Sequence, residues 1–171
     1  MKINTTFTSK LDCAEIQATY YDQEDLKELT GKKIHSVHAF CFYQNKLVIV
    51  YCENKGYWHP IGGGVEAGET YEEAVIREVQ EESNMKVMEQ QLIAFQDSIH
   101  PDKPDDVITQ TRSVCLVEPY GDFVSDPDGD VTEIKLIDPK DYKQYFDWGE
   151  VGERLMRQVL EVLRDLYADN S

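Results

Sequence analysis

Residues 62–85 read GGGVEAGETYEEAVIREVQEESNM, and this stretch decides the fold. It holds seven glutamates and only one basic side chain, Arg77. Thr70 and Glu73 form the T-x-x-E pattern of a capping box, in which each residue satisfies a free backbone N–H of the other. The sequence therefore predicts a helix that begins near Thr70 and runs to about Asn84.

The glutamates of this predicted helix are not scattered. At 100° per residue, Glu78, Glu81 and Glu82 fall within an arc of about 100°, whereas Val75 and Val79 lie toward an adjacent flank and can enter the core. Carboxylates at these spacings repel one another, so a divalent cation would stabilise this face. The alternative is a solvated acidic face, which is the usual meaning of a charge run.

The glycines before the helix, Gly62–Gly64, supply a second part of the pattern. Glycine lets the backbone approach a ligand closely, and loop carbonyls can ligate a cation. The G-x-x-x-x-G-K-[ST] pattern is absent, so the loop is not a P-loop. A glycine run followed by a helix with a shared carboxylate face indicates a cation-dependent phosphate site.

This segment resembles the Nudix box, G-x5-E-x7-R-E-U-x-E-E-x-G-U, in which U is a bulky apolar residue. The positions that match in register are Gly63, Glu69, Arg77, Glu78, Val79, Glu81, Glu82 and Met85. The one departure is Asn84, where the pattern has glycine. Asn tolerates the left-handed conformation of a helix end better than other non-glycine residues do, so we expect the fold to survive this change.

The resemblance implies an α/β fold, the Nudix-type α/β/α sandwich with a mixed β-sheet and a C-terminal helix. It also implies a hydrolase that cleaves a nucleoside diphosphate linked to another moiety, through water attack at phosphorus. Mg²⁺, or Mn²⁺ in its place, would bind Glu78, Glu81, Glu82 and the Gly62 carbonyl and would lower the pKa of a bound water. Glu81 and Glu82 are the first metal ligands on this reading, and Glu78 is either a ligand or the general base.

Arg77 is expected to orient a glutamate through a charge-assisted hydrogen bond, and Glu69 is the family's usual partner. Spacing alone is equally compatible with a surface pair between Arg77 and Glu73 or Glu81. A carboxylate from outside the box often completes such sites. Glu133 is the preferred candidate because a strand would hold it rigidly; the other candidates in the same turn are Asp126, Asp128 and Asp130.

The sequence gives less specific signals for the residues that would bind the rest of the substrate. Trp58 and His59 precede the glycines and are candidate substrate-binding residues, although aromatic residues in strands usually pack against the sheet. Tyr43, Tyr51 and Tyr57 have the same ambiguity. Pro101 stands at a spacing that resembles a marker of the ADP-ribose-cleaving subgroup, but turns attract proline in any case.

The flanking sequence predicts a mixed sheet. Residues 34–43 and 46–53 read as strands joined by a hairpin at Gln44-Asn45, and further strands are predicted at 92–99, 107–117 and 131–137. Two helices follow, the second over 150–167 with an apolar stripe. We assign residues 34–171 to the Nudix domain and 1–33 to an N-terminal extension or edge elements, with strand and loose extension both open.

The amino-acid composition limits the binding partners and the cellular compartment that we expect for this protein. The net charge of −16 disfavours duplex nucleic acid, because such binding relies on neutralising many phosphates. No apolar stretch reaches the length of a membrane span, no signal-peptide pattern is present, and the four cysteines lack a C-x-x-C pair, so we expect a cytoplasmic protein. His35 and His38 would point to opposite faces of a strand, which argues against a histidine metal site. A homodimer is a mild expectation.

Three functions remain. The first is an Mg²⁺-dependent pyrophosphohydrolase acting on a nucleotide or nucleotide derivative, with Glu78, Glu81 and Arg77 as catalytic residues. The second is a non-catalytic nucleotide-binding Nudix module that regulates something, which a degenerate box would mark; this box keeps every acid. The third is a diphosphate isomerase, for which Cys52 and Cys115 are candidates by residue type only.

Overall fold

The computed structural model describes residues 1–127 and 129–170, so Asp128 lies outside the described residues. Within them, eight strands form one sheet. The strands are β1 (Lys2–Thr8), β2 (Glu15–Tyr21), β3 (Ile34–Tyr43), β4 (Lys46–Cys52), β5 (Tyr57–Gly64), β6 (Met85–Ile99), β7 (Val107–Pro119) and β8 (Val131–Ile137). Their order across the sheet is β1-β2-β6-β7-β3-β5-β4-β8. Only the β3–β7 pairing among these neighbours is parallel, so the sheet is mixed, as predicted.

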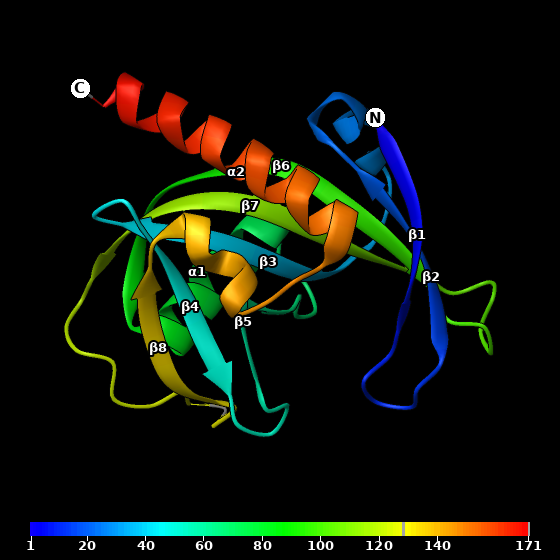
Figure 1. The fold of residues 1–171 in the computed structure, drawn as a ribbon, viewed down its shortest axis with the longest axis horizontal. Helices are drawn as coiled ribbons and strands as arrows, with labels where there is room; N and C mark the ends of the chain where they lie inside the picture. Colours follow the sequence, from blue (N-terminus) through cyan, green and yellow to red (C-terminus); the bar gives the residue numbers. More distant parts are fainter. Residues whose placement is uncertain (128, 171) are drawn as a thin grey trace.

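Two α-helices cover opposite faces of the sheet (Figure 1). They are α1 (Tyr71–Ser83) and α2 (Gly149–Asp169), and two short 3-10 helices accompany them, η1 (Gln23–Leu29) and η2 (Pro139–Gln144). The predicted α/β/α sandwich with a C-terminal helix is therefore confirmed. None of the helices in residues 1–127 and 129–170 combines the length and apolar character needed to cross a membrane.

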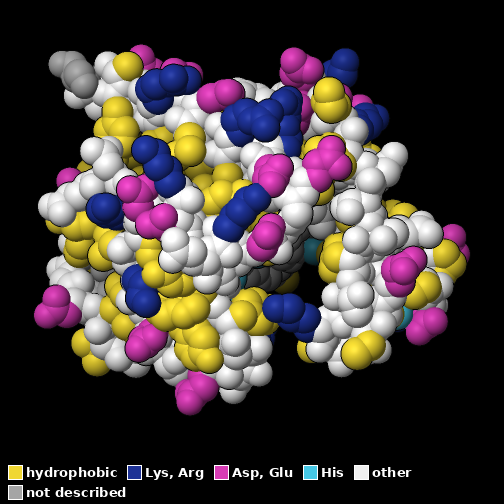
Figure 2. Space-filling view, in the orientation of Figure 1, with side chains coloured by type: hydrophobic (Ala, Val, Ile, Leu, Met, Phe, Trp, Pro, Cys, Tyr) yellow, Lys and Arg dark blue, Asp and Glu magenta, His cyan; other side chains and the backbone are white. Residues whose placement is uncertain are grey.

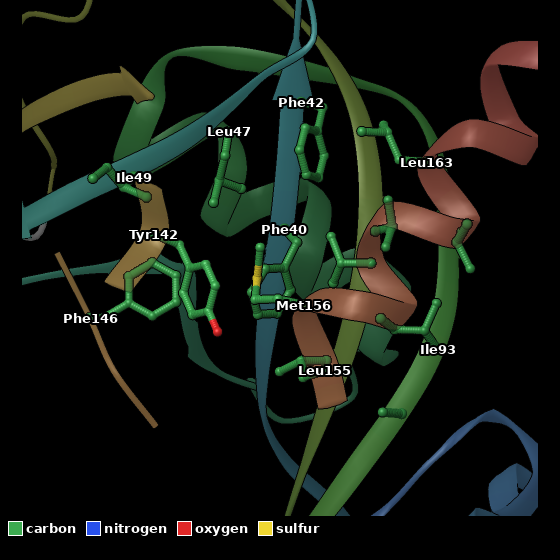
Figure 3. Close-up of a cluster of buried hydrophobic side chains, with 14 of the residues drawn as sticks. Phe40, Phe42, Leu47, Ile49, Ile93, Tyr142, Phe146, Leu155, Met156 and Leu163 are labelled. Atoms are coloured by element: carbon green, nitrogen blue, oxygen red, sulfur yellow. The ribbon is translucent and has the colours of Figure 1, made fainter. Parts of the chain in front are cut away.

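Side-chain alternation along β3 builds both halves of the core. Val37, Ala39 and Cys41 point toward α1, whereas Phe40 and Phe42 point toward α2. On the α2 side these rings meet the apolar stripe of that helix (Figure 3). Both phenylalanines are almost completely buried, and truncating a core ring of this kind to alanine typically costs about 3–5 kcal/mol.

The hairpin between β3 and β4 forms where the sequence predicts it. Gln44 and Asn45 both adopt positive φ, at 50° and 62°, as a two-residue hairpin turn requires. The two strands then pair from Tyr43 opposite Lys46 inward to Cys41 opposite Val48. This register carries the alternation of β3 into β4, so β4 also contributes to both halves of the core.

Strand β6 is longer than the sequence predicts, because it begins at Met85 rather than Leu92. The added residues include Glu89, Gln90 and Gln91, which have little intrinsic preference for strands. Pairing with β7 holds them in place, with register shifts between Val87 and Glu89 and between Leu92 and Ala94. Likewise, the first of the two predicted closing helices is the short 3-10 helix η2.

The N-terminal residues extend the sheet. Strand β2 pairs with the C-terminal half of β6, and β1 pairs with β2 to form the sheet edge. The Met1 amine lies 2.8 Å from Asp22, whose other carboxylate oxygen accepts a 2.7 Å bond from Arg154 of α2. These contacts link the start of β1 to the C-terminal helix. The sequence left open whether the N-terminal residues form a strand or a loose extension, and in the structure they form strands.

Candidate active site

The acidic helix α1 is defined at both ends by local contacts. Thr70 Oγ1 accepts the Glu73 N–H at 3.2 Å, and the Glu73 carboxylate accepts the Thr70 N–H at 2.9 Å, which confirms the capping box. At the other end Asn84 adopts the left-handed conformation, with φ 53° and ψ 41°, and donates its backbone N–H to the Gln80 carbonyl. The side-chain amide of Asn84 also donates to the Asp122 carbonyl at 3.0 Å. The departure from glycine is therefore accommodated as expected.

The carboxylate face of α1 turns toward the sheet. Glu78 and Glu82 are 8% and 7% exposed, and Glu81 is half-buried beside them. Burial raises the pKa of Glu78. Burial also raises the pKa of Glu82 to about 8, an effect that the Gly62 N–H opposes and the Glu78 and Asp126 charges reinforce. Acids held under these conditions are typical of functional sites.

The glycines of β5 make room for these acids. A Cβ added to Gly63 would lie 2.2 Å from Glu78 Oε1, and one added to Gly62 would lie 2.3 Å from the Val37 carbonyl oxygen and 2.5 Å from His38 Cδ2. Gly64 differs, because nothing lies nearer than 3.9 Å. Gly62 also donates its N–H to Glu82 Oε2 at 3.1 Å. Two of the three glycines are therefore required by close approach.

Arg77 links the acids to one another and to β5. Its Nε and Nη2 donate to the two oxygens of Glu69 at 2.8 and 3.0 Å, a bidentate pair of the kind predicted. Its Nη1 donates to Glu78 at 2.7 Å and Glu81 at 3.2 Å, and Nη2 also reaches the Gly64 carbonyl at 2.8 Å. Hydrogen bonding to Arg77 lowers the pKa of Glu69. Arg77 is thus an orienting residue and also makes the pair with Glu81.

The donor set suits a hard divalent cation. Glu78, Glu81, Glu82 and the Gly62 carbonyl are all oxygen donors, and the Cβ-free surface of Gly63 lets a carboxylate lie against the backbone. In the part of the chain that the structure describes, no three potential ligand side chains converge on a single point. Arg77 instead holds Glu78 and Glu81, which relieves the repulsion between neighbouring carboxylates.

An open groove of about 460 Å³ adjoins this cluster. Arg77, Gln80 and Glu81 line one side, and Asp122 and Ser125 from the segment between β7 and β8 line the other. A groove of this volume is within the range of small-molecule sites. Of the acids of α1, Glu81 therefore lines a space large enough for a small phosphorylated ligand, together with Arg77.

Among the candidates for a carboxylate from outside the box, Asp126 and Glu133 lie in different places. Glu133 pairs with Tyr51 in the sheet, one position from Ile134, which packs on the α1 side; Glu133 is exposed and points to the opposite face. Asp126 is only 7% exposed and is the acid whose charge acts on both Glu78 and Glu82. Strand alternation thus directs Glu133 away from α1, and its role as a metal ligand stays a prediction that this geometry does not favour.

The two candidate substrate-binding residues separate. Trp58 lies on the α2 side, 5.3 Å from the Tyr51 ring and 6.1 Å from the Tyr145 ring, with Lys135 over its face. These contacts favour the packing alternative, and a substrate role for Trp58 stays a prediction. His59 is buried on the other face, and its Nδ1 lies 2.6 Å from the Pro60 carbonyl oxygen. Burial lowers its pKa, which favours the neutral ring. A substrate role for His59 stays a prediction.

Sequence reasoning missed two further groups. Lys55, in the turn between β4 and β5, exerts its charge on both Glu82 and His59. Arg112 lies buried on the α2 side of the sheet in contact with Trp148. The only available signal was a charged residue inside an otherwise strand-like run at 107–117, and that signal does not say which face the side chain occupies.

These features define a class: an α/β/α sandwich in which a glycine-rich strand faces an acidic helix organised around one arginine. The family model described as NUDIX domain matches residues 32–159, and the chain belongs to that family. The predictions of the Nudix family and of a hydrolase of that family are confirmed at this level. The comparison with curated proteins found no match to this sequence.

Solved structures show the same fold at low sequence identity. The pyrophosphohydrolase BsRppH of Bacillus subtilis has a TM-score of 0.66 and 18% identity, covering 92% of this chain and 97% of that one. A MutT structure from work on Aliivibrio salmonicida and Vibrio cholerae has a TM-score of 0.56 and 22% identity, covering 76% and 99%. The NUDIX domain of Shewanella oneidensis NrtR, crystallised with ADP ribose, has a TM-score of 0.55 and 17% identity, covering 80% and 92%.

Proposed function

We propose that this protein is an Mg²⁺-dependent pyrophosphohydrolase that cleaves a nucleoside diphosphate linked to another moiety, by attack of water on phosphorus. The observation that carries the proposal is the pair of buried acids, Glu78 and Glu82, held against Gly63 and Gly62 on a helix whose Glu81 lines an open groove. Burying acids in this way is unfavourable for folding alone. A divalent cation and a diphosphate together account for it.

The chain's own residues divide the work. Glu81, Glu82 and the Gly62 carbonyl are proposed to hold the cation, Mg²⁺ or Mn²⁺, and Glu78 either joins them or accepts the proton of the attacking water. When bound, the cation would neutralise phosphate oxygens and promote ionisation of the nucleophilic water. Arg77 touches Glu78 and Glu81 and is proposed to position them. Asp126 is proposed as the carboxylate from outside the box, in place of Glu133.

The diphosphate isomerase alternative loses its support. Cys52 is 2% exposed and Cys115 is completely buried. A catalytic cysteine must reach its substrate, so these residues are better explained as core packing.

A substrate panel tests the proposal. The purified protein with Mg²⁺ is offered nucleoside triphosphates, oxidised nucleoside triphosphates, ADP-ribose, dinucleoside polyphosphates and nucleotide sugars, and products are identified by chromatography. We expect hydrolysis of at least one class, and its loss in EDTA. Nucleotide binding without hydrolysis of any compound would instead support the non-catalytic regulatory module.

A further inference from the structure

A buried cation on the α2 side of the sheet lacks an acidic partner. Arg112 of β7 is 4% exposed, and its Nη1 makes only long contacts, 3.4 Å to the Gln110 carbonyl and 3.3 Å to the Thr111 carbonyl. Its Nε is buried without a hydrogen-bond partner among the described residues, and none of their carboxylates forms an ion pair with it. A buried guanidinium is strongly unfavourable when unpaired. In a chain of net charge −16 acids are plentiful, so their absence here points to a counter-ion from outside.

Aromatic side chains surround Arg112: the charge of Arg112 interacts with Tyr20, and His38 and Trp148 lie beside it. His38 stands opposite Arg112 on the neighbouring strand, and its Nδ1 is buried without a partner in residues 1–127 and 129–170. The Trp148 ring stacks on His38 at 5.4 Å and 16°, and the Arg112 Cζ lies 5.9 Å from the Trp148 centroid. Burial, together with the Arg112 charge, lowers the pKa of His38, so the ring is neutral and can donate from Nδ1. Two unused donor positions therefore lie on adjacent strands.

Gly62 connects this polar group to the glutamate cluster. One side of Gly62 faces His38, and its backbone N–H donates to Glu82. A Cβ at Gly62 would collide with the Val37 carbonyl oxygen and the His38 ring, so the strands pack closely at this position. On the α2 side the molecular surface is hollowed beside the β1–β2 hairpin, and histidine surface is visible within the hollow (Figure 2). A molecule whose diphosphate lies at the glutamates would have to pass around the edge of β5 and through this hollow to meet Arg112.

We infer that Arg112 determines specificity by binding a phosphate group of the substrate other than the diphosphate that is cleaved, with His38 as the second donor. This inference rests on the proposed function. Arginine suits the role because its planar fork bonds two phosphate oxygens at once. A neutral nucleobase edge would satisfy the donors but would leave the charge uncompensated, which favours an anion.

Binding without metal gives the first test. Trp58→Phe leaves Trp148 as the one tryptophan of the sequence, so its fluorescence reports on the Arg112 site. AMP and inorganic phosphate should change the emission, whereas adenosine should not. In Arg112→Gln, AMP should bind at least about 10-fold more weakly, because charge-assisted bonds are lost. Arg112→Lys should retain part of the affinity, and Arg157→Gln, an exposed arginine of α2, should retain all of it.

Kinetics give the second test. Arg112→Gln should raise KM by about 10-fold for ATP or a 5′-triphosphorylated oligonucleotide and leave KM for ADP-ribose unchanged, since ADP-ribose has no phosphate beyond its diphosphate. Equal binding of adenosine and AMP, or an equal rise in KM for all substrates, would overturn the inference. Arg112-dependent AMP binding in a protein that hydrolyses nothing would support the site and reject the proposed function. If Arg112→Gln fails to fold, judged by circular dichroism, His38→Ala serves in both tests.

Discussion

The N-terminal corner of the sheet and the face of α1 each bury a carboxylate, and the molecule treats the two in opposite ways. Asp22 is completely buried and accepts from the Met1 amine, from Arg154 and from the Glu24 N–H. Burial alone would raise its pKa, but these contacts lower it. Glu82 is almost as buried, yet one backbone N–H is its main support, and its pKa rises to about 8.

This difference in supporting contacts indicates that Asp22 stabilises the fold, whereas Glu82 is available to bind a ligand. Asp22 ties the first residue to the last helix, and its charge is neutralised within the chain. Glu82 lies beside Glu78 and forms no ion pair among the described residues. The Gly62 N–H and the Lys55 charge only partly offset its burial, so a bound cation would stabilise its ionised form. Arg112, on the opposite face of the sheet, is a buried positive charge that has no acidic partner among the described residues. The acids of α1 and Arg112 are the two places where we propose that the substrate binds, and at both places the chain does not fully compensate a buried charge.

The largest expected effect comes from Glu82→Gln. Removing a metal ligand should lower kcat by at least about 100-fold, since even indirect supports of metal ligands contribute 10- to 100-fold. In metal-free buffer the same variant should melt at the same temperature or about 2–4 °C higher at pH 8, because an acid whose folded-state pKa is raised loses stability as pH rises. Steady-state kinetics and calorimetry measure the two effects. Unchanged turnover in this variant would remove Glu82 from the site.

The second-largest effect on activity is expected from Gly63→Ala. Its Cβ would overlap the Glu78 carboxylate, so we expect a loss of activity of about 10- to 100-fold with a nearly normal fold. Gly64→Ala is the matched control, because the neighbouring position is open and should tolerate a methyl group. Equal activity in the two variants would contradict the close approach of Glu78 to β5.

The outside carboxylate can be assigned by a second matched pair. Asp126→Asn should reduce metal-dependent turnover about 10-fold or more, because its charge acts on Glu78 and Glu82, whereas Glu133→Gln should have no effect. Mn²⁺ titrations of activity measure the change in apparent metal affinity. The reverse pattern would restore the assignment made from the sequence.

Arg77→Lys should have a moderate effect. Lysine keeps the charge but cannot contact both oxygens of Glu69 together with Glu78, so we expect kcat to fall about 10-fold. Glu69→Gln should reproduce part of this loss, since it weakens the same bidentate pair. A normal kcat in both variants would show that the arginine contributes only to stability.

The smallest expected effect on activity is at Asp22. Asp22→Asn should destabilise the protein by about 2 kcal/mol at pH 7 and leave kcat unchanged, because it removes charge-assisted bonds far from α1. An acid with a depressed folded-state pKa stabilises above its unfolded pKa, and this contribution is lost as pH falls through the folded value. The difference between wild type and variant should therefore vanish in strong acid. Urea unfolding at pH 7 and at pH 2 measures it.

Much of the site was predictable because its signals are local. The capping box, the shared face of Glu78 and Glu82, and the left-handed Asn84 all depend on residues a few positions apart, where helix geometry applies directly. The role of Arg77 with Glu69 followed from the family resemblance. Strands β3, β4 and β8 were also found, because their alternation and the Gln44-Asn45 turn lie within the segments themselves.

The features that the sequence could not predict depend on residues that are distant in the chain. Glu133 was chosen because it lies on a strand, but the face it occupies depends on pairing with β4, including a register shift near Tyr51. The first half of β6 lacks strand preference and is held by β7. The N-terminal strands needed the far end of β6 as a partner.

The amino-acid sequence by itself determined that this chain has a helix with a shared acidic face after a glycine run, and hence its family. Only the tertiary structure decided which acids are buried, that Asp126 rather than Glu133 joins them, and that Arg112 lacks an acid. The physical reason is that period and capping are properties of neighbouring residues, whereas burial and charge compensation depend on segments that meet only in the folded sheet.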